Sequence, residues 1–467
     1  MCIAIPPSVP GRGGGRESSH VRGRNSARCG DIVLRVADSR PHPPSPPRSQ
    51  ENRVVTTTDT RLQDSGPVPS PGARRLALLA LALGGFGIGT TEFVSMGLLP
   101  EIASSLGIGE PVAGHAISAY ALGVVIGAPV IAVTTARVPR KALLVALTAV
   151  FVVGNAATAI APTYETLVGA RVLAGLPHGA YFGLAALVAA HIAPPGARAR
   201  SVASVMLGLS VANVVGVPVA SWLGQTFGWR AAFVLVTLIG IVTLVAVAAR
   251  VPHLGSMPQS RPVAELGALR SPQVLLTLLV GAVGFGGLFA VYTYISTSLT
   301  DVAGMPRSWV PIALMVYGLG MVAGNIVGGR IADRALMPGL YAAMGSMAVM
   351  LAVFVVALQH PVSALIVLFL VGLSGAAAIP ALQTRLMDVA GDAQTLAASL
   401  NHAALNAANA FGAWIGGVVI AAGLGYTAPA AVGALLAAAG VAVLGVASLY
   451  SRRDERQRHQ VVVGGVR

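Results

Sequence analysis

Long apolar runs, each of about 20 residues, follow one another from residue 76 almost to the end of this chain. A helix of about 20 apolar residues crosses the hydrocarbon core of a bilayer, whereas a barrel strand would be about ten residues of alternating polarity. Because the backbone must satisfy its hydrogen bonds inside the bilayer, the pattern predicts an all-α integral membrane protein. We expect twelve spans, at 76–99, 112–134, 142–161, 165–191, 202–223, 231–249, 273–298, 309–329, 338–358, 361–383, 395–422 and 427–450.

The distribution of charge predicts how the helices are oriented. Only 10% of the residues are charged, against about 25% in soluble domains. The net charge of +14 would suit a nucleic-acid partner, but the basic residues lie in the N-terminal tail and in loops on one side of the predicted membrane. The opposite loops hold only Arg230 and Arg307. This bias predicts a multi-pass protein of the cytoplasmic membrane, with both termini cytoplasmic and no nucleic-acid partner.

A sequence motif of the second span is repeated in the eighth. Tyr120-Ala-Leu-Gly-Val-Val-Ile-Gly127 becomes Tyr317-Gly-Leu-Gly-Met-Val-Ala-Gly324, and its glycines are typical of helix-packing seams. The repeat predicts two six-helix pseudo-symmetric bundles around a shared site, as in many secondary transporters. We expect the protein to be a monomer. Its parts would be a disordered Arg/Pro/Ser-rich cytoplasmic tail or a mis-called translation start (1–73), the first bundle (74–250), a cytoplasmic linker (251–270), the second bundle (271–450) and a cytoplasmic tail (451–467).

Motifs of the common enzyme classes do not occur in the sequence. It contains no phosphate-cradling glycine loop with Lys, no His-Glu-x-x-His and no Gly-x-Ser-x-Gly. Its two cysteines, Cys2 and Cys29, both lie in the tail, so no thiolate metal site is expected. We therefore expect a protein that is not an enzyme, that holds no metal or cofactor and that draws on an ion gradient.

Two ionisable residues lie deep inside predicted spans, where they are costly and point to function. Glu92 precedes Pro100 by eight residues in the first span, and Arg171 follows Thr163 by eight in the fourth. Each is therefore about 12 Å from the outer face. The two could form an ion pair that serves proton coupling, a purely structural pair, or no contact. The repeat places Leu368 opposite Arg171, so the arginine belongs to one half only.

Other polar residues of the spans could line a cavity between the bundles. His178 shares a helical stripe with Arg171, and a packing histidine is the alternative reading. In the eleventh span His402, Asn406 and Asn409 share a face, with interhelical hydrogen bonding as the alternative. The substrate-cavity candidates are His178, Asn213, Tyr120, Tyr292, Tyr294, Gln383, His402 and Asn406.

Several segments resemble the major facilitator superfamily, in particular its twelve-helix drug:proton antiporter branch near the arabinose-efflux-like and chloramphenicol-efflux permeases. They are Gly87-Ile-Gly-Thr-Thr-Glu-Phe-Val-Ser-Met-Gly-Leu-Leu-Pro100, Tyr120-Ala-Leu-Gly-Val-Val-Ile-Gly-Ala-Pro129, Arg171-Val-Leu-Ala-Gly-Leu-Pro-His-Gly179 and Gly216-Val-Pro-Val-Ala-Ser-Trp-Leu-Gly224. The resemblance covers roughly residues 75–450. It implies that helices 1, 4, 7 and 10 surround a central cavity, and that Arg171 matches an arginine associated with proton coupling.

The loop between the second and third spans departs from the pattern of that family. Ala136 and Pro139 replace the expected Asp and Gly, which leaves Arg137, Arg140 and Lys141. The corresponding loop after the eighth span keeps Asp333 and Arg334, which could hold the gate instead. These five residues are the gating candidates, and topology charges are the alternative role for the first three.

Taken together, the residues and the resemblance predict a proton-coupled transporter that exports small, mostly apolar compounds, such as chloramphenicol-like antibiotics, by alternating access. Glu92 would exchange the proton and Arg171 would tune it. Protons, a small-molecule substrate and the lipid bilayer are the expected partners. Two alternatives remain open: a carrier that exports or imports a sugar, nucleoside or other metabolite, and a membrane receptor that does not transport.

Overall fold

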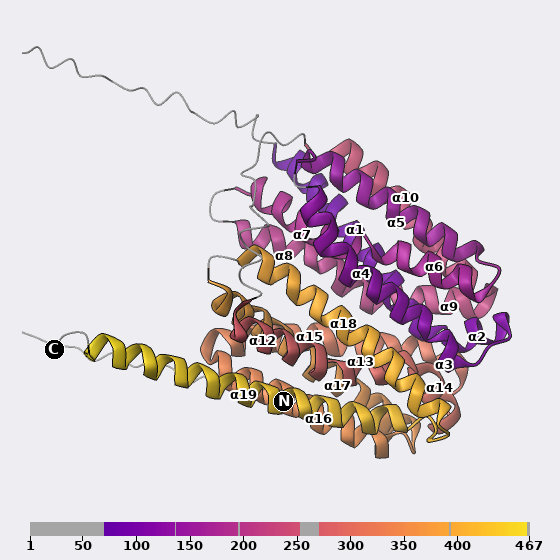
Figure 1. Ribbon diagram of the computed structural model, residues 1–467. Coiled ribbons are helices and arrows are strands. Elements are labelled where there is room, and N and C mark those ends of the chain that lie inside the picture. Colours follow the sequence, from indigo (N-terminus) through magenta and orange to yellow (C-terminus); the bar gives the residue numbers. More distant parts are fainter. Residues whose placement is uncertain (1–69, 136, 195–196, 253–269, 392–393, 465–467) are drawn as a thin grey trace, which may run out of the picture. The chain divides into compact units, whose positions relative to one another are not determined.

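The computed structural model describes residues 70–135, 137–194, 197–252, 270–391 and 394–464. All of them belong to one compact unit, and twelve helical segments in it are long and apolar enough to span a membrane. Figure 1 shows these segments running side by side. The predicted all-α fold with twelve spans is confirmed, since each predicted run overlaps one of these segments.

The first bundle contains six spans, several of them divided into shorter helices. Span 1 is α1 (Pro71–Gly97), which is followed by the short helix α2 (Leu99–Leu106). Spans 2 and 3 are α3 (Glu110–Ala113) with α4 (His115–Thr134), and α5 (Arg140–Ile160). Span 4 is α6 (Tyr164–Gly175) with α7 (His178–His191). Span 5 is α8 (Arg198–Val211), the π-helical turn η1 (Ala212–Gly216) and α9 (Val217–Phe227), and span 6 is α10 (Trp229–Arg250).

The second bundle repeats this order. Span 7 is α12 (Pro272–Gly284), α13 (Gly286–Thr293) and α14 (Ile295–Thr297). The π-helical turn η3 (Ser298–Val302) and the 3-10 turn η4 (Arg307–Trp309) precede span 8, α15 (Val310–Arg334). Spans 9 to 12 are α16 (Leu336–Ala357), α17 (Pro361–Ala390), α18 (Gln394–Ala421) and α19 (Ala428–Gly464). The bundles meet where α4 packs on α18 and where η1 and α9 pack on α15.

Several helix ends differ from the predicted boundaries by five residues or more, as at Arg334 of α15 and Ala390 of α17. Ser70 caps α1 by accepting a hydrogen bond from the amide of Ala73, so the helix begins within the segment expected to be a tail. Residues 1–69 of that segment and residues 253–269 of the predicted linker lie outside the described residues. At the other end, α19 continues to Gly464, well past residue 450.

The repeated glycines pack the helices of each bundle in the same way. A Cβ on Gly127 of α4 would lie 2.1 Å from the carbonyl oxygen of Leu176, and a Cβ on Gly324 of α15 would lie 2.1 Å from that of Leu373. Neither position leaves room for a side chain. The seam therefore joins span 2 to span 4 in the first bundle and span 8 to span 10 in the second, which is how an internal repeat builds equivalent helix contacts.

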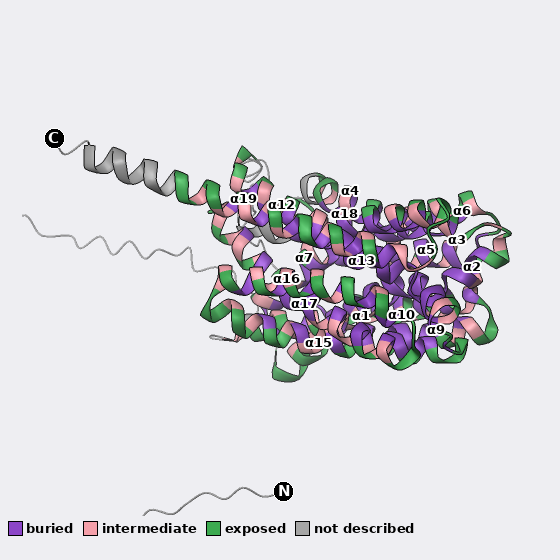
Figure 2. Cartoon of the chain, turned by 90° about the horizontal axis from the view of Figure 1, so that it is seen from below, coloured by how far each residue is buried: buried purple, intermediate pink, exposed green. Residues whose placement is uncertain are grey.

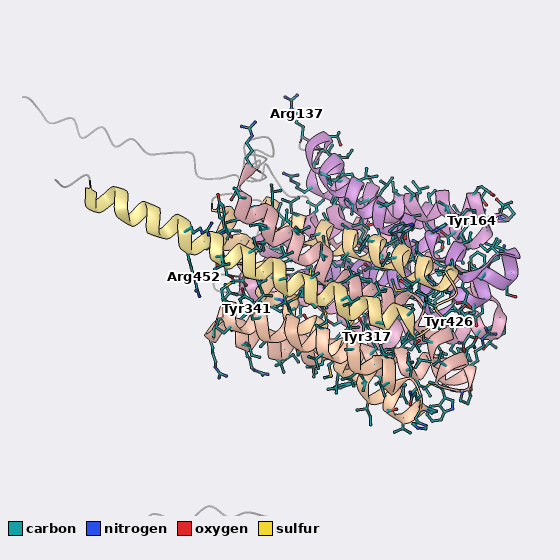
Figure 3. All side chains as sticks on the ribbon, turned by 60° about the horizontal axis from the view of Figure 1, so that its bottom comes forward. Arg137, Tyr164, Tyr317, Tyr341, Tyr426 and Arg452 are labelled. Carbon is teal, nitrogen blue, oxygen red and sulfur yellow. The ribbon has the colours of Figure 1, made fainter. Side chains whose placement is uncertain are left out.

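The two ends of the helices differ in the residues they carry. Figure 3 shows Arg137 and Arg452 at one end, and Tyr164 and Tyr426 at the other. We call the end with Tyr164 and Tyr426 the outer end, following the orientation that the basic loops predict.

This orientation predicts the accessibility of single cysteines placed in a chain that lacks Cys2 and Cys29. A membrane-impermeant maleimide should label Pro162→Cys, in the exposed loop before α6, on intact cells. It should label Arg453→Cys, near the end of α19, only after the cells are opened. The reverse pattern would overturn the orientation.

Candidate functional site

A buried guanidinium is the centre of the site. Arg171 lies on α6, which begins at a capping box formed by Thr163 and Thr166, and its side chain is 0% exposed. Its Nη1 donates to Thr91 Oγ1 at 2.9 Å, and its Nη2 donates to the carbonyl oxygen of Thr91 at 3.0 Å. A buried charge without hydrogen bonds would cost several kcal/mol, so Thr91 is a principal support of this arginine.

Aromatic faces complete the surroundings of the arginine. The guanidinium carbon lies 4.3 Å from the centre of the Tyr120 ring and 5.4 Å from that of Phe233, and such contacts stabilise a desolvated cation by about 2 kcal/mol. The Thr91 hydroxyl donates to Asn155 Oδ1 on α5 at 2.5 Å. Arg171, Thr91, Asn155 and Tyr120 therefore form one buried set, called the arginine network below.

Glu92 is buried next to this network but does not pair with the arginine. Among the described side chains, the one ion pair joins Arg307 to Glu101. The ion pair between Glu92 and Arg171, one of the alternatives that the sequence left open, is absent. Consecutive helix residues point about 100° apart, and the guanidinium of Arg171 bonds to Thr91 instead. Glu92 faces the side chain of Asn409 on α18, while Arg171 stays near enough to act on it through space.

A chain of rings leads from the arginine network to the second bundle. The Tyr120 hydroxyl and His178 Nδ1 are 3.0 Å apart, and the His178 ring centre lies 5.3 Å from that of Phe182. Phe182 stacks on His402 of α18, with ring centres 5.8 Å apart and planes at 2°. The structure thus brings together three of the predicted cavity residues, and Phe182 is the ring that joins them across the bundles.

Amides of α18 and η1 supply unpaired acceptors within the protein. Asn406 Nδ2 donates to the carbonyl of His402 at 3.1 Å, and Asn213 Nδ2 donates to that of Leu209 at 3.0 Å. The Oδ1 atoms of Asn406 and Asn213 have no hydrogen-bond partner, nor has either polar side-chain atom of Asn409. Buried polar groups are usually paired, so the Oδ1 atoms of Asn406 and Asn213 keep the capacity to accept a hydrogen bond.

The predicted tyrosines of span 7 have different positions. Tyr292 stacks on Tyr317 with ring centres 4.2 Å apart and meets the edge of Phe93 at 5.7 Å, which joins span 1 to spans 7 and 8. The Tyr294 hydroxyl donates to the carbonyl of Ala413 at 2.9 Å, so Tyr294 ties α18 to span 7. Gln383 on α17 is only half-buried.

Contacts between the bundles close the outer end. Thr297 Oγ1 donates to Glu110 Oε2 at 2.6 Å, Ser118 Oγ donates to the carbonyl of Ala410 at 2.9 Å, and Arg307 approaches Glu101 to 3.4 Å. Burial raises the pKa of Glu101, and the Arg307 charge opposes this rise. Every residue from 87 to 100 and from 284 to 299 is buried, so the outer parts of spans 1 and 7 are enclosed by protein (Figure 2).

The sequence matches the model of a known protein family. The model described as Major Facilitator Superfamily matches residues 81–395, which is more than half of the chain. The chain belongs to this superfamily.

Individual proteins are also similar to this chain. It is 42% identical over 370 residues to "Inner membrane transport protein YdhP" of Escherichia coli (strain K12), covering 79% of this chain and 94% of that protein. It is 34% identical over 362 residues to "Chloramphenicol resistance protein" of Streptomyces lividans, covering 75% and 90%. The crystal structure of D-xylose-proton symporter superposes with a TM-score of 0.65 at 16% identity, covering 78% and 97%, and shows the same fold. The protein is thus a transporter of the Major Facilitator Superfamily.

The gating candidates of this superfamily member lie at the end with the basic loops. Asp333 and Arg334 end α15 and are exposed, and Arg137 points away from the helices (Figure 3). Arg140 and Lys141 are half-buried at the start of α5. None of these five side chains forms an ion pair with another described residue, so among the residues that the structure describes no salt bridge at this end matches the one at the outer end.

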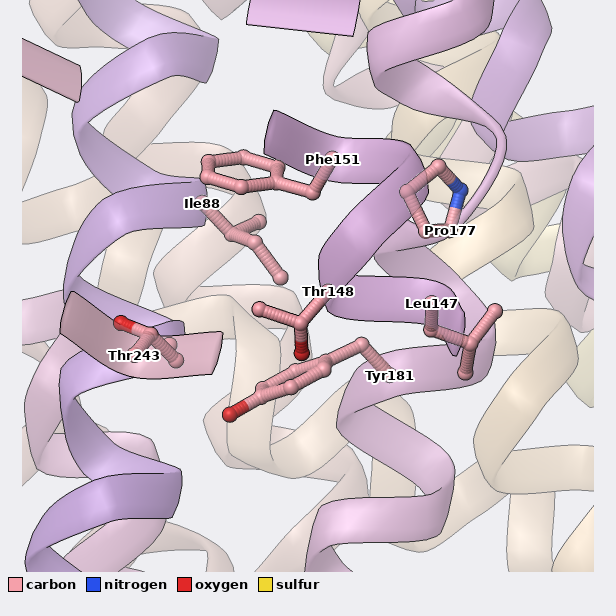
Figure 4. Close-up of a pocket in the computed structure, with 8 residues that line it drawn as sticks. Ile88, Leu147, Thr148, Phe151, Pro177, Tyr181 and Thr243 are labelled. Atoms are coloured by element: carbon pink, nitrogen blue, oxygen red, sulfur yellow. The ribbon is translucent and has the colours of Figure 1, made fainter. Parts of the chain in front are cut away.

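A small cavity inside the first bundle is too narrow for a substrate. Its lining comes from α1, α5, α7 and α10 with Pro177, and its volume is about 10 Å³ (Figure 4), which is room for about one water. The hydroxyls of Tyr181, Thr148 and Thr243 in its wall all donate to backbone carbonyls.

Sequence reasoning missed two residues that the structure makes important, Thr91 and Asn155, whereas Phe182 follows from the helical stripe that it shares with Arg171 and His178. The available signal was weak. Thr91 is adjacent to Glu92, and Asn155 is the one amide in the apolar run 142–161. A buried threonine or asparagine can also bond to its own helix, so neither residue pointed to Arg171.

Proposed function

We propose that this transporter exports small, mostly apolar compounds in exchange for protons by alternating access. The observation that carries the proposal is Glu92, a buried carboxyl of span 1 that has no ion-pair partner among the described residues. A charged carboxylate in the membrane interior is costly, whereas the nearby Arg171 favours the charged form. These opposed influences suit a group that gains and loses one proton per cycle.

The rings between the bundles support an apolar substrate with a few polar groups. Phe93, Tyr292 and Tyr317 form one cluster, and Phe182 with His178 and His402 forms another. Unpaired amide oxygens of Asn213 and Asn406 would accept hydrogen bonds from the substrate. The 34% identical relative that is named a chloramphenicol resistance protein, matched over 90% of its length, supports an antibiotic as cargo.

The closed outer end supports loading from the cytoplasm. Release to the outside then requires the contacts of Glu101 with Arg307 and of Glu110 with Thr297 to separate. Arg137, Arg140, Lys141, Asp333 and Arg334 would form the opposing gate in the outward-open state. We further propose that both termini are cytoplasmic and that a monomer carries the complete site.

Proton flux in vesicles tests the proposal. Purified protein is reconstituted into liposomes with an acidic lumen and a pH-sensitive dye, and chloramphenicol is added outside. Exchange of drug for protons should raise the lumenal pH faster than in protein-free vesicles. A fall in lumenal pH would indicate symport. No response to chloramphenicol or to a panel of apolar antibiotics would overturn the proposal, and no response to sugars and nucleosides as well would favour a receptor.

A second candidate is transport of a sugar or another polar metabolite. The unpaired acceptors of α18 and η1 favour it, and so does a 27% identical relative named "Probable sugar efflux transporter" of Pasteurella multocida. The same vesicles treated with sugars and nucleosides distinguish the two candidates, because each predicts proton movement with one substrate class.

A further inference from the structure

We infer that Asn155 is a positioning residue for Arg171, which it orients through the hydroxyl of Thr91. The inference deepens the proposed function, because Arg171 is the group proposed to tune Glu92. Asn155 lies on α5, is 0% exposed, and its side chain bonds to Thr91 and to the carbonyl of Phe151, not to the arginine. Its effect must therefore pass through Thr91.

The hydroxyl of Thr91 departs from a pattern that its neighbours follow. A threonine inside a helix commonly donates its proton to the carbonyl four residues earlier. Thr90 does so to Phe86, and Thr148, Thr158 and Thr243 do so on α5 and α10. Thr91 instead donates to Asn155 Oδ1 on another helix. Asn155 thus draws the Thr91 proton away from its usual acceptor.

The amide of Asn155 is itself fixed in one orientation. Its Nδ2 donates to the carbonyl of Phe151 at 2.8 Å, so its Oδ1 faces Thr91. A hydroxyl has one proton and two lone pairs. Once the proton of Thr91 points to Asn155, a lone pair is available to Arg171 Nη1 at 2.9 Å. Each hydrogen bond in this series sets the direction of the next.

Loss of Asn155 would free the arginine to approach Glu92. Thr91 would then return its proton to its own helix, and Arg171, whose Nε already has no partner, would lose an aligned acceptor. The charged or titratable groups that act on Glu92 are Arg171 from α6 and Tyr120 from α4, and the second bundle presents the neutral Asn409. Glu92 is therefore the one carboxylate to which the freed guanidinium would turn.

The expected result of Asn155→Leu is a shift of the pH profile of transport. An ion pair with arginine favours the charged form of a carboxylate, which then titrates about one pH unit or more lower. The pH of half-maximal proton exchange should therefore fall by about one unit. Thr91→Val removes the same acceptor and should shift the profile likewise. Thr91→Ser keeps the hydroxyl and should restore the wild-type profile.

Thr158→Val is the matched control, because Thr158 lies one turn along α5 and bonds only to Gly154. It should leave the profile unchanged. Superimposable profiles for Thr91→Val and the wild type would overturn the inference, as would an equal shift in Thr158→Val. Should Asn155→Leu not fold, Thr91→Val carries the test alone.

A second measurement separates this inference from the proposed function. The melting temperature of detergent-solubilised protein is recorded against pH for each variant, with and without Glu92→Gln, so that the part due to Glu92 is obtained by difference. That part should shift to lower pH in Thr91→Val even if no substrate is transported. An unshifted curve beside intact antiport would refute the role of Asn155 alone, whereas a shifted curve without antiport would refute only the proposed function.

Discussion

Glu92→Gln is expected to reduce proton-driven transport to the level of protein-free vesicles while folded protein remains in the membrane. Glutamine has nearly the shape of a protonated glutamate, so the packing around Asn409 and the arginine network is retained. It cannot release a proton, however, and the cycle loses the step that links substrate to the gradient. The loss should be complete because Glu92 is the one acidic side chain buried in the spans of the described structure.

The measurement is substrate-dependent alkalinisation of acid-loaded vesicles, together with exchange of labelled chloramphenicol at equal pH on both sides. Exchange needs no net proton movement and should persist in Glu92→Gln. Glu165→Gln is the control, since this exposed carboxylate lies six residues before Arg171. Full antiport by Glu92→Gln would remove Glu92 from the mechanism, and loss of exchange as well would indicate a structural role.

Much of the fold could be predicted because it depends on patterns that run along the chain. Spans are visible as apolar runs, and the repeated glycines predicted packing seams in both bundles. The structure adds that the seams join span 2 to span 4 and span 8 to span 10, with Gly175 against Tyr120 and Gly372 against Tyr317. Helix ends were less predictable, since capping by Ser70 and the charged extension of α19 do not change the apolar pattern.

The site was predicted only in part, for a physical reason. Counting residues from the helix ends gives the depth of Glu92 and Arg171, but depth does not give the rotation of a helix about its axis. Side chains of consecutive helix residues point about 100° apart. For this reason Thr91, and not its neighbour Glu92, accepts the hydrogen bonds of Arg171. Asn155 lies on a third helix, and its choice of partner depends on a contact that no spacing in the sequence records.

Tyr120 and Tyr317 are equivalent in the internal repeat but make different contacts. In the first bundle the Tyr120 ring lies against Arg171. In the second, the equivalent of Arg171 is the buried Leu368, and the Tyr317 ring stacks on Tyr292 instead. One half thus carries a buried cation at this position and the other an aromatic pair. The asymmetry agrees with a division in which the first bundle handles the proton and the second contributes apolar contact to the substrate.

Gly175→Ala is expected to destabilise the protein by about 1–3 kcal/mol, the usual cost of overpacking a close contact, and to impair transport. The new Cβ would lie 2.1 Å from the carbonyl oxygen of Tyr120, which is backbone and cannot turn aside. Spans 2 and 4 must therefore separate. Because Tyr120 covers the guanidinium of Arg171 at 4.3 Å and contacts His178 at 3.0 Å, the separation disturbs both.

Two matched variants make the result specific. Gly169→Ala lies on the same helix with nothing within 4 Å of the added Cβ, so it should keep wild-type stability and transport. Gly372→Ala meets the carbonyl oxygen of Tyr317 at 2.6 Å in the second bundle. It should lower the melting temperature without shifting the pH profile, because no arginine depends on that contact. Equal melting temperatures for Gly175→Ala and Gly169→Ala would contradict the close packing, and equal pH profiles for Gly175→Ala and Gly372→Ala would contradict the unequal roles of the two bundles.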